Sequence, residues 1–124
     1  MYELVIQTDF AAAHNLRDYP GNCERLHGHN WKVRVELRAR RLDRLGMVMD
    51  FREVKARLTE VLKLLDHQYL NEIEPFRKKN PTTENVAYFI FGQLSPALPK
   101  GVSVGKVTVW ESERCAGSYA PDRK

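Results

Sequence analysis

The chain has 124 residues, with 20 Lys and Arg against 16 Asp and Glu, four His and two Cys. Its length predicts a single domain over residues 1–124, and a composition of 43% hydrophobic and 29% charged residues excludes disordered and fibrous proteins. With no apolar run near the roughly 20 residues that span a bilayer, no signal-peptide pattern and only two Cys, we expect a cytoplasmic protein with no membrane partner. The net charge of +4 suits an anionic partner without specifying which one.

The first half of the chain is predicted to form two strands and a helix. Alternation of apolar and polar residues predicts strands over 2–10 and 29–41, then a turn over 42–46 and a short return strand over 47–49. Asp50, with Glu53 three residues later, is a candidate N-cap for an amphipathic helix over 51–65.

The second half is predicted to continue with a helix and two strands. After a connector over 66–80, Thr82 or Thr83 caps a helix that ends before Pro96. A strand over 102–109 changes phase at Gly105, which indicates a bulge, and a last short strand is predicted over 115–120. The order β-β-α-α-β-β predicts an α+β fold, an antiparallel sheet with two helices on one face.

Three of the four His are predicted to meet at one end of the first strand pair. His27 and His29 lie two residues apart at the entry to a strand and therefore point to the same side, while His14 closely follows the preceding strand. Three imidazoles with an open fourth position are typical of a catalytic zinc site. The alternative is that these are surface or core imidazoles without a ligand. That interpretation would be preferred for any one His alone, but the joint placement of all three favours a metal site.

Other chemically active residues allow several interpretations from spacing alone. Cys23, four residues before His27, fits a fourth metal ligand, a thiolate base or nucleophile, or a small buried apolar side chain. Asp66 next to His67 fits either an acid–base pair or a cap at the end of a helix. Glu111, at the end of an apolar strand, fits a solvated strand end or an anchor for a ligand with N–H donors.

In these segments the sequence resembles the 6-pyruvoyl-tetrahydropterin synthase and 6-carboxytetrahydropterin synthase family. The matching pieces occur in family order over almost the whole chain: residues 10–14, 23–29, 49–51, 65–71, 81–84 and 111–112. The resemblance implies the tunnelling (T-) fold, with subunits joined through their sheets into a trimeric barrel and two trimers stacked into a hexamer.

The resemblance also implies a zinc enzyme that acts on 7,8-dihydroneopterin triphosphate. It makes Cys23 a general base or acid and makes Asp66 and His67 a second proton relay contributed by a neighbouring subunit. The implied zinc ligands are His14, His27 and His29.

Substrate contacts are implied for a further set of residues. Glu111 would hold the pterin ring through its N–H groups, and Thr82 and Thr83 would line the same pocket. Basic residues at the mouth would receive the triphosphate. Glu24, directly after Cys23, departs from many relatives and lies near the position where some of them use Glu to cleave the side chain differently.

The expected reaction is that of 6-carboxy-5,6,7,8-tetrahydropterin synthase, a lyase that releases acetaldehyde and triphosphate on the route to queuosine. The alternatives are cleavage to 6-hydroxymethyl-dihydropterin for folate and the 6-pyruvoyl synthase reaction. A non-catalytic metal- or pterin-binding module is disfavoured because it has no need of Cys23, Asp66 and His67. RNA binding is disfavoured because no aromatic platform is interleaved with the basic residues of 31–41.

Overall fold

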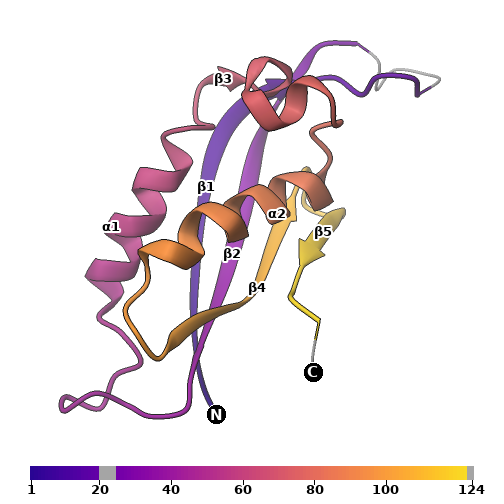
Figure 1. Cartoon of the computed structure of the whole chain (residues 1–124). Helices are drawn as coiled ribbons and strands as arrows, with labels where there is room; N and C mark the ends of the chain where they lie inside the picture. Colours follow the sequence, from indigo (N-terminus) through magenta and orange to yellow (C-terminus); the bar gives the residue numbers. More distant parts are fainter. Residues whose placement is uncertain (20–24, 123–124) are drawn as a thin grey trace.

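The computed structural model describes residues 1–19 and 25–122, so Cys23 and Glu24 lie outside the described residues. Its main elements are a sheet and two α-helices (Figure 1). The strands are β1 (Tyr2–His14), β2 (His27–Ala39), β3 (Gln68–Tyr69), β4 (Val102–Trp110) and β5 (Ala116–Tyr119). The α-helices are α1 (Phe51–Leu62) and α2 (Thr83–Leu94), and the short 3-10 helices are η2 (Leu70–Glu72), η3 (Glu74–Arg77) and η4 (Ser95–Ala97).

The five strands lie in the order β3-β1-β2-β4-β5. β1 and β2 form a long antiparallel pair whose register runs from Tyr2 opposite Ala39 to His14 opposite His27. β4 pairs antiparallel with β2, and β5 antiparallel with β4. β3 pairs parallel with β1, so the sheet is mixed rather than wholly antiparallel as predicted.

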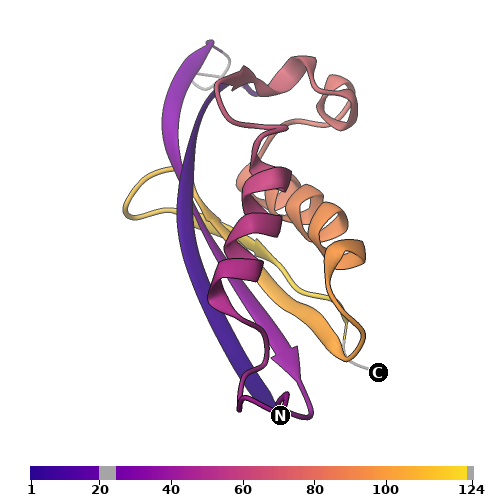
Figure 2. The same ribbon diagram turned by 90° about the vertical axis from the view of Figure 1, so that its left-hand side faces the viewer.

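Both α-helices lie on one face of the curved sheet, which confirms the predicted α+β arrangement (Figure 2). Asp50 caps α1 by accepting a 2.8 Å hydrogen bond from the N–H of Arg52. Thr82, rather than Thr83, caps α2 by accepting a 3.1 Å bond from the N–H of Asn85. In the described part of the chain, no helix combines the length and the apolar character that a bilayer crossing requires.

The helices and the sheet enclose one apolar core. Alternate residues of β2 are fully buried beneath the helices, because successive side chains of a strand point to opposite faces. Their neighbours on the other face, among them Lys32 and Arg34, are exposed or half-buried, so this face is open in the single chain. The core residues from β2, α1 and α2 include Trp31, Val33, Val35, Leu37, Leu58, Val86 and Ile90.

Three local expectations were wrong, and one was confirmed. The strand expected over 47–49 is not formed, and the helix expected to reach residue 65 ends at Leu62, where Leu65 N–H bonds to the Leu62 carbonyl in a tighter turn. The connector over 66–80 contains β3, η2 and η3, elements too short to give a periodic signal. The bulge is confirmed, because the register of β2 on β4 skips Gly105 between Lys106 and Val104.

Candidate metal centre and active site

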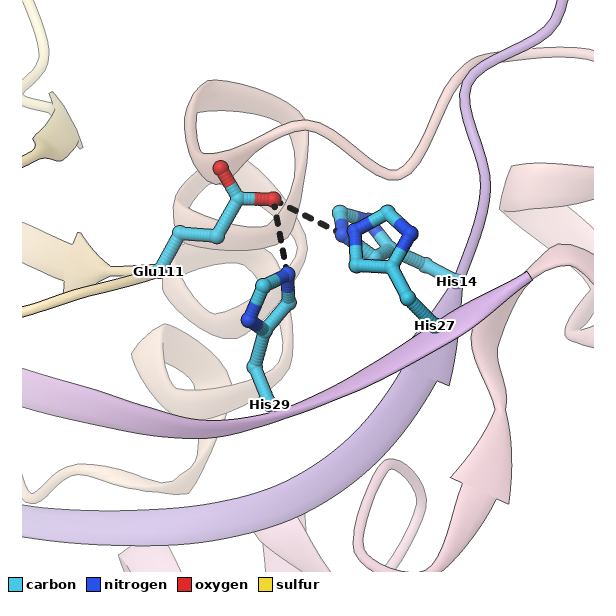
Figure 3. Close-up of side chains that lie close together, drawn as sticks. All are labelled: His14, His27, His29 and Glu111. Atoms are coloured by element: carbon cyan, nitrogen blue, oxygen red, sulfur yellow. Dashed lines mark ion pairs between the residues drawn. The ribbon is translucent and has the colours of Figure 1, made fainter. Parts of the chain in front are cut away.

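The three predicted metal ligands meet at one end of the sheet, on the face covered by the helices. The antiparallel register sets His14 directly opposite His27 and Ala12 opposite His29, so all three imidazoles project to the same side. Their ring centroids lie 4.5 to 5.1 Å apart. Glu111 follows β4 and points into the same cluster (Figure 3). One ligand atom from each of the four residues lies within 4.8 Å of the others.

Backbone carbonyls orient two of these imidazoles. His14 Nδ1 lies 2.8 Å from the Pro81 carbonyl oxygen, and His27 Nδ1 lies 2.7 Å from that of Arg25. Since a carbonyl oxygen only accepts, Nδ1 carries the hydrogen in both rings, and Nε2 of the neutral ring keeps its lone pair. This arrangement leaves the Nε2 atoms free to bind a metal.

Burial also favours neutral imidazoles. His14 is buried, and desolvation is the main cause that lowers its pKa, against the opposing effects of the Pro81 carbonyl and the Glu111 carboxylate. Desolvation likewise lowers the pKa of His29. Neutral imidazoles are the form that binds metal ions.

Glu111 belongs to this cluster, which the sequence alone did not indicate. Its Oε1 lies 2.7 Å from His14 Nε2 and 3.4 Å from His29 Nε2 (Figure 3). Both Nε2 atoms are buried, and within the described residues neither makes a hydrogen bond. Three imidazole nitrogens and one carboxylate oxygen facing one point are a donor set that zinc accepts, so the cluster fits a metal ion.

Asp66 and His67 form a second chemically active group, at the edge of β1. Asp66 Oδ1 accepts a 2.9 Å hydrogen bond from the N–H of Ala11, and the N–H of His67 donates to the Ala11 carbonyl over 2.6 Å. Asp66 Oδ2 lies 3.1 Å from His67 Nδ1. The Ala11 N–H is the main cause that holds the pKa of Asp66 below its ordinary value. His67 has a φ of 59°, a left-handed conformation uncommon for a non-glycine residue, and 81% of its side chain is exposed.

Within the described part of a single chain, the Asp66–His67 pair shares a cleft with one residue of the histidine cluster, His29. His67 and the cluster residue His29 line a cleft of about 600 Å³ that also includes Ala11, Ala13, Gly28 and Asn30. These four belong to the set of alternate strand residues on the open face, whereas His14, His27 and His29 belong to the helix-covered face. The cleft beside His67 therefore lies on the side where another molecule can approach.

The start of α2 lies next to the cluster. Pro81, whose carbonyl contacts His14, immediately precedes the capping residue Thr82. Thr83 Oγ1 donates a 2.7 Å hydrogen bond to Glu84 Oε1, and this bond is the main cause that lowers the pKa of Glu84. Glu84 was predicted only as a first-turn helix residue, and nothing in the sequence pattern distinguished it further.

Two asparagines hold the chain that leaves β1, a feature that sequence reasoning missed. Asn71 Oδ1 accepts from the N–H of Asn15 over 3.0 Å, and Asn71 Nδ2 donates to the Asn15 carbonyl over 2.9 Å. Asn80 makes the same pair of bonds with Arg17, at 2.8 and 3.0 Å. Each side-chain amide thus takes the place of a strand partner directly after His14.

Comparison with known proteins finds relatives that are similar in sequence and in fold. A family model described as 6-pyruvoyl tetrahydropterin synthase matches residues 3–122. The chain belongs to this family. It is 38% identical to the 6-carboxy-5,6,7,8-tetrahydropterin synthase of Synechocystis sp., covering 99% of this chain and 96% of the relative. It is 34% identical to the dihydroneopterin monophosphate aldolase of Pyrococcus furiosus, covering 87% of this chain and 88% of the relative.

A solved structure agrees with this membership in the 6-pyruvoyl tetrahydropterin synthase family. The Caenorhabditis elegans 6-pyruvoyl tetrahydropterin synthase superposes with a TM-score of 0.86 at 29% identity, covering 98% of this chain and 96% of that chain. The expected tunnelling fold is therefore confirmed. Members of the family are pterin-processing enzymes of the lyase type, and the histidine cluster lies in the part of this chain that the family model matches.

Proposed function

We propose that this protein is a zinc-dependent 6-carboxy-5,6,7,8-tetrahydropterin synthase that converts 7,8-dihydroneopterin triphosphate with release of acetaldehyde and triphosphate. The observation that carries the proposal is the convergence of three imidazoles and a carboxylate at the end of the sheet. The choice among family reactions is supported by the 38% identity with the Synechocystis enzyme of that name over almost the whole chain. The product would enter the biosynthesis of queuosine in the cytoplasm.

The metal centre would be held by His14, His27 and His29. A bound Zn²⁺ supplies Lewis acidity, which makes the hydroxyl and C–H groups of a substrate side chain easier to deprotonate. The chain's own contribution is to present three imidazoles, two of them fixed by carbonyl contacts at Nδ1. These contacts hold the donor atoms in place before the metal arrives.

Proton transfer would be carried out by Cys23 and by the Asp66–His67 pair. Asp66 is fixed by the Ala11 N–H and holds His67 through Nδ1, so His67 Nε2 is free to carry a proton. Cys23 lies outside the described residues and is proposed as the second proton-transfer group, four residues before the ligand His27.

Substrate binding would involve both ends of the pocket beside the metal. Thr82 and Thr83 begin α2 next to His14, and together with Glu24 they are proposed to line the pterin site. Glu111 is proposed to accept hydrogen bonds from the N–H groups of the pterin ring. Basic residues at the mouth would bind the triphosphate.

The active site is proposed to form between subunits of a homo-oligomer, a trimer or a dimer of trimers. Supporting this, the exposed His67 lines a cleft that includes open-face residues of the sheet, and His29 is the one member of the cluster among the residues that line it. The Asp66–His67 relay of one subunit would then complete the active site around the metal centre of its neighbour. No nucleic acid or membrane partner is proposed.

Incubation of the protein with 7,8-dihydroneopterin triphosphate, followed by mass spectrometry of the pterin product, tests this function. We expect 6-carboxy-5,6,7,8-tetrahydropterin. Cys23→Ala and His67→Ala should each lower kcat by about 100-fold or more, as loss of a general acid or base typically does, while zinc remains bound. Glu113→Gln is the control, because Glu113 is an exposed carboxylate outside the cluster. A protein that binds pterin and zinc without turning over the substrate would contradict the enzyme proposal.

A second candidate reaction is cleavage of the side chain to 6-hydroxymethyl-dihydropterin. It is favoured by the 34% identity with the Pyrococcus furiosus dihydroneopterin monophosphate aldolase and by the adjacent Cys23 and Glu24. The same product assay separates it from the first candidate and from the 6-pyruvoyl reaction. If Glu24 directs cleavage, Glu24→Gly should shift the product ratio away from the hydroxymethyl compound without loss of zinc.

A further inference from the structure

The contact between Glu111 and His14 brings together two hydrogen-bond acceptors. The Pro81 carbonyl holds the hydrogen of His14 on Nδ1, so Nε2 of the neutral ring presents a lone pair. That lone pair faces Glu111 Oε1 over 2.7 Å, and an ionised carboxylate oxygen is also only an acceptor. At this separation the two atoms repel each other unless a cation lies between them.

A single proton between the two atoms would relieve this repulsion less completely than a metal ion would. One proton on His14 Nε2 would serve the bond to Glu111, but the same carboxylate oxygen also lies 3.4 Å from the buried Nε2 of His29. A metal ion satisfies both nitrogens and the oxygen at once, and His27 completes the group. Three nitrogens and one oxygen are the right number of donors for a four-coordinate zinc site, in which His14 Nε2 and Glu111 Oε1 would separate from 2.7 Å to about 3.3 Å as the ion enters.

We propose that Glu111 is the fourth metal ligand of the substrate-free protein, closing the site that His14, His27 and His29 form. The inference rests on the proposed function, because it assumes that this cluster holds the catalytic metal. Glu111 would thus have two successive roles: metal ligand before substrate binds, and the pterin contact proposed above after it binds. A closed four-ligand site has no position for substrate, so Glu111 leaves the metal when substrate binds and its carboxylate then becomes available to the pterin N–H groups.

The location of Glu111 permits this exchange. It is the first residue after β4, in the segment 111–115 that connects to β5, and its side chain is 35% exposed. His14, by contrast, is buried and its ring is held at Nδ1 by the Pro81 carbonyl. Glu111 is therefore the member of the group that moves, and the histidines are the members that stay.

Cobalt spectroscopy of the full chain tests the ligand assignment without relying on activity. After removal of bound metal, one equivalent of Co²⁺ is added to wild type, Glu111→Gln and Glu113→Gln, and the visible absorption and the Co²⁺ affinity are recorded. We expect Glu111→Gln to change the band positions and intensities and to weaken binding by about tenfold or more. Glu113→Gln, the same change of charge two residues away, should keep the wild-type spectrum. Glu111→Asp, which keeps a carboxylate, should keep a spectrum with a carboxylate donor, and circular dichroism checks that each variant folds.

Addition of 7,8-dihydroneopterin tests the exchange. In wild type the Co²⁺ spectrum should change on saturation with this probe. Identical spectra and affinities for wild type and Glu111→Gln would overturn the ligand assignment, and if wild type still forms product the proposed function survives that result. A wild-type spectrum that stays unchanged when the probe is bound would overturn the exchange. Failure of wild type to bind Co²⁺ or Zn²⁺ at all would overturn both the inference and the zinc-dependent function.

Discussion

Backbone carbonyls, rather than carboxylates, orient two imidazoles of the metal cluster. The Pro81 carbonyl fixes His14 and the Arg25 carbonyl fixes His27, each through Nδ1. A carbonyl partner sets the tautomer of each ring without adding negative charge. The only carboxylate in the described cluster, Glu111, faces the Nε2 side, where the proposed metal ion would be bound.

Replacing one imidazole should remove the metal without unfolding the protein. His29→Gln takes away a donor whose side chain is 25% exposed, so little packing is lost, whereas His14 is buried. We expect zinc affinity to fall by about 100-fold or more, measured by competition with a chromophoric chelator. His67→Gln is the control and should retain one zinc per chain. Equal zinc affinity in His29→Gln and wild type would contradict the assignment of His29.

The pKa of Asp66 gives a prediction for acid stability. Because the Ala11 N–H lowers the pKa of the folded carboxyl below its ordinary value of 3.8, the unfolded chain binds more protons there. Asp66 therefore contributes stability above about pH 4 and loses that contribution as the pH falls through the folded pKa. Thermal unfolding should show Asp66→Asn a few degrees below wild type near pH 6, with the gap closing toward about pH 3. A gap that widens on acidification would show that the carboxylate does not act through this bond.

At the scale of single residues, the sequence predicted the three histidines but not the groups that surround them. His27 and His29 form a local pattern, and His14 is linked to them by one hairpin. Glu111 and Pro81 come from segments far along the chain, and only the packing of β4 and α2 onto the first strand pair brings them to the cluster. The position of Glu111 within the histidine cluster was therefore not predicted, and binding of a ligand's N–H groups was the nearest interpretation available.

Between elements, the exit of the chain from β1 is fixed by side chains in place of a strand. β3 pairs with β1 only at Ala12 and Ala13, and beyond His14 the amides of Asn71 and Asn80 bond both backbone groups of one residue each. The connector over 66–80 is thereby tied by hydrogen bonds to the end of β1, which carries the proposed metal ligand His14 and contacts the proposed relay residues of 66–67. The segment that leads toward Cys23 leaves from this end of β1.

Loss of the Asn71 amide should destabilise this hydrogen-bonded end of β1. Asn71 is 7% exposed, and its removal leaves the Asn15 N–H and carbonyl without their partner, which costs about 1–3 kcal/mol of unfolding free energy. Asn71→Ala should also weaken zinc binding, because the backbone that the Asn71 amide holds is that of Asn15, the residue directly after His14. Urea unfolding and chelator competition measure the two effects. Gln93→Ala, an exposed position on α2, is the control and should change stability by less than about 0.5 kcal/mol. An Asn71→Ala protein as stable as this control would contradict the role of the amide.

Elements with a strong period were predictable, and short ones were not. Both α-helices and the long strands were expected from periodicity and capping, and Gly105 was correctly identified as a bulge from the change of phase between its flanking valines. β3 has two residues, too few for alternation to register, and its parallel pairing arises because α1 returns the chain to the edge of β1. Alternation of apolar and polar residues likewise predicts that the second face of the sheet is open, but it does not predict which molecule covers that face.

For the whole molecule, the question is how the histidine cluster and the Asp66–His67 pair come to act on one substrate. The histidine cluster belongs to the helix-covered face, while His67 is 81% exposed and lines a cleft that includes open-face residues and, from the cluster, His29. Long strands with an open face and a largely unpaired β1 edge are surfaces that a second copy covers well. A site shared between subunits would bring both groups to one substrate.

Mixing two inactive variants tests this sharing. His29→Ala disables the metal centre and keeps the relay, whereas His67→Ala disables the relay and keeps the metal centre. If each site takes one group from each of two neighbouring subunits, co-expression of both variants in equal amounts should restore about one quarter of wild-type activity, since each group is intact with even odds. Product formation from 7,8-dihydroneopterin triphosphate measures the recovery.

The double variant His29→Ala/His67→Ala is the matched control for that experiment. Mixed with either single variant, it offers only one kind of intact group, so no site is complete and activity should stay at the level of the single variants. If the two single variants also fail to recover activity when assembled together, the metal cluster and the relay must act within one chain. His67, which is 81% exposed, would then have to act on the cluster through the side of His29, the cluster residue that lines the same cleft.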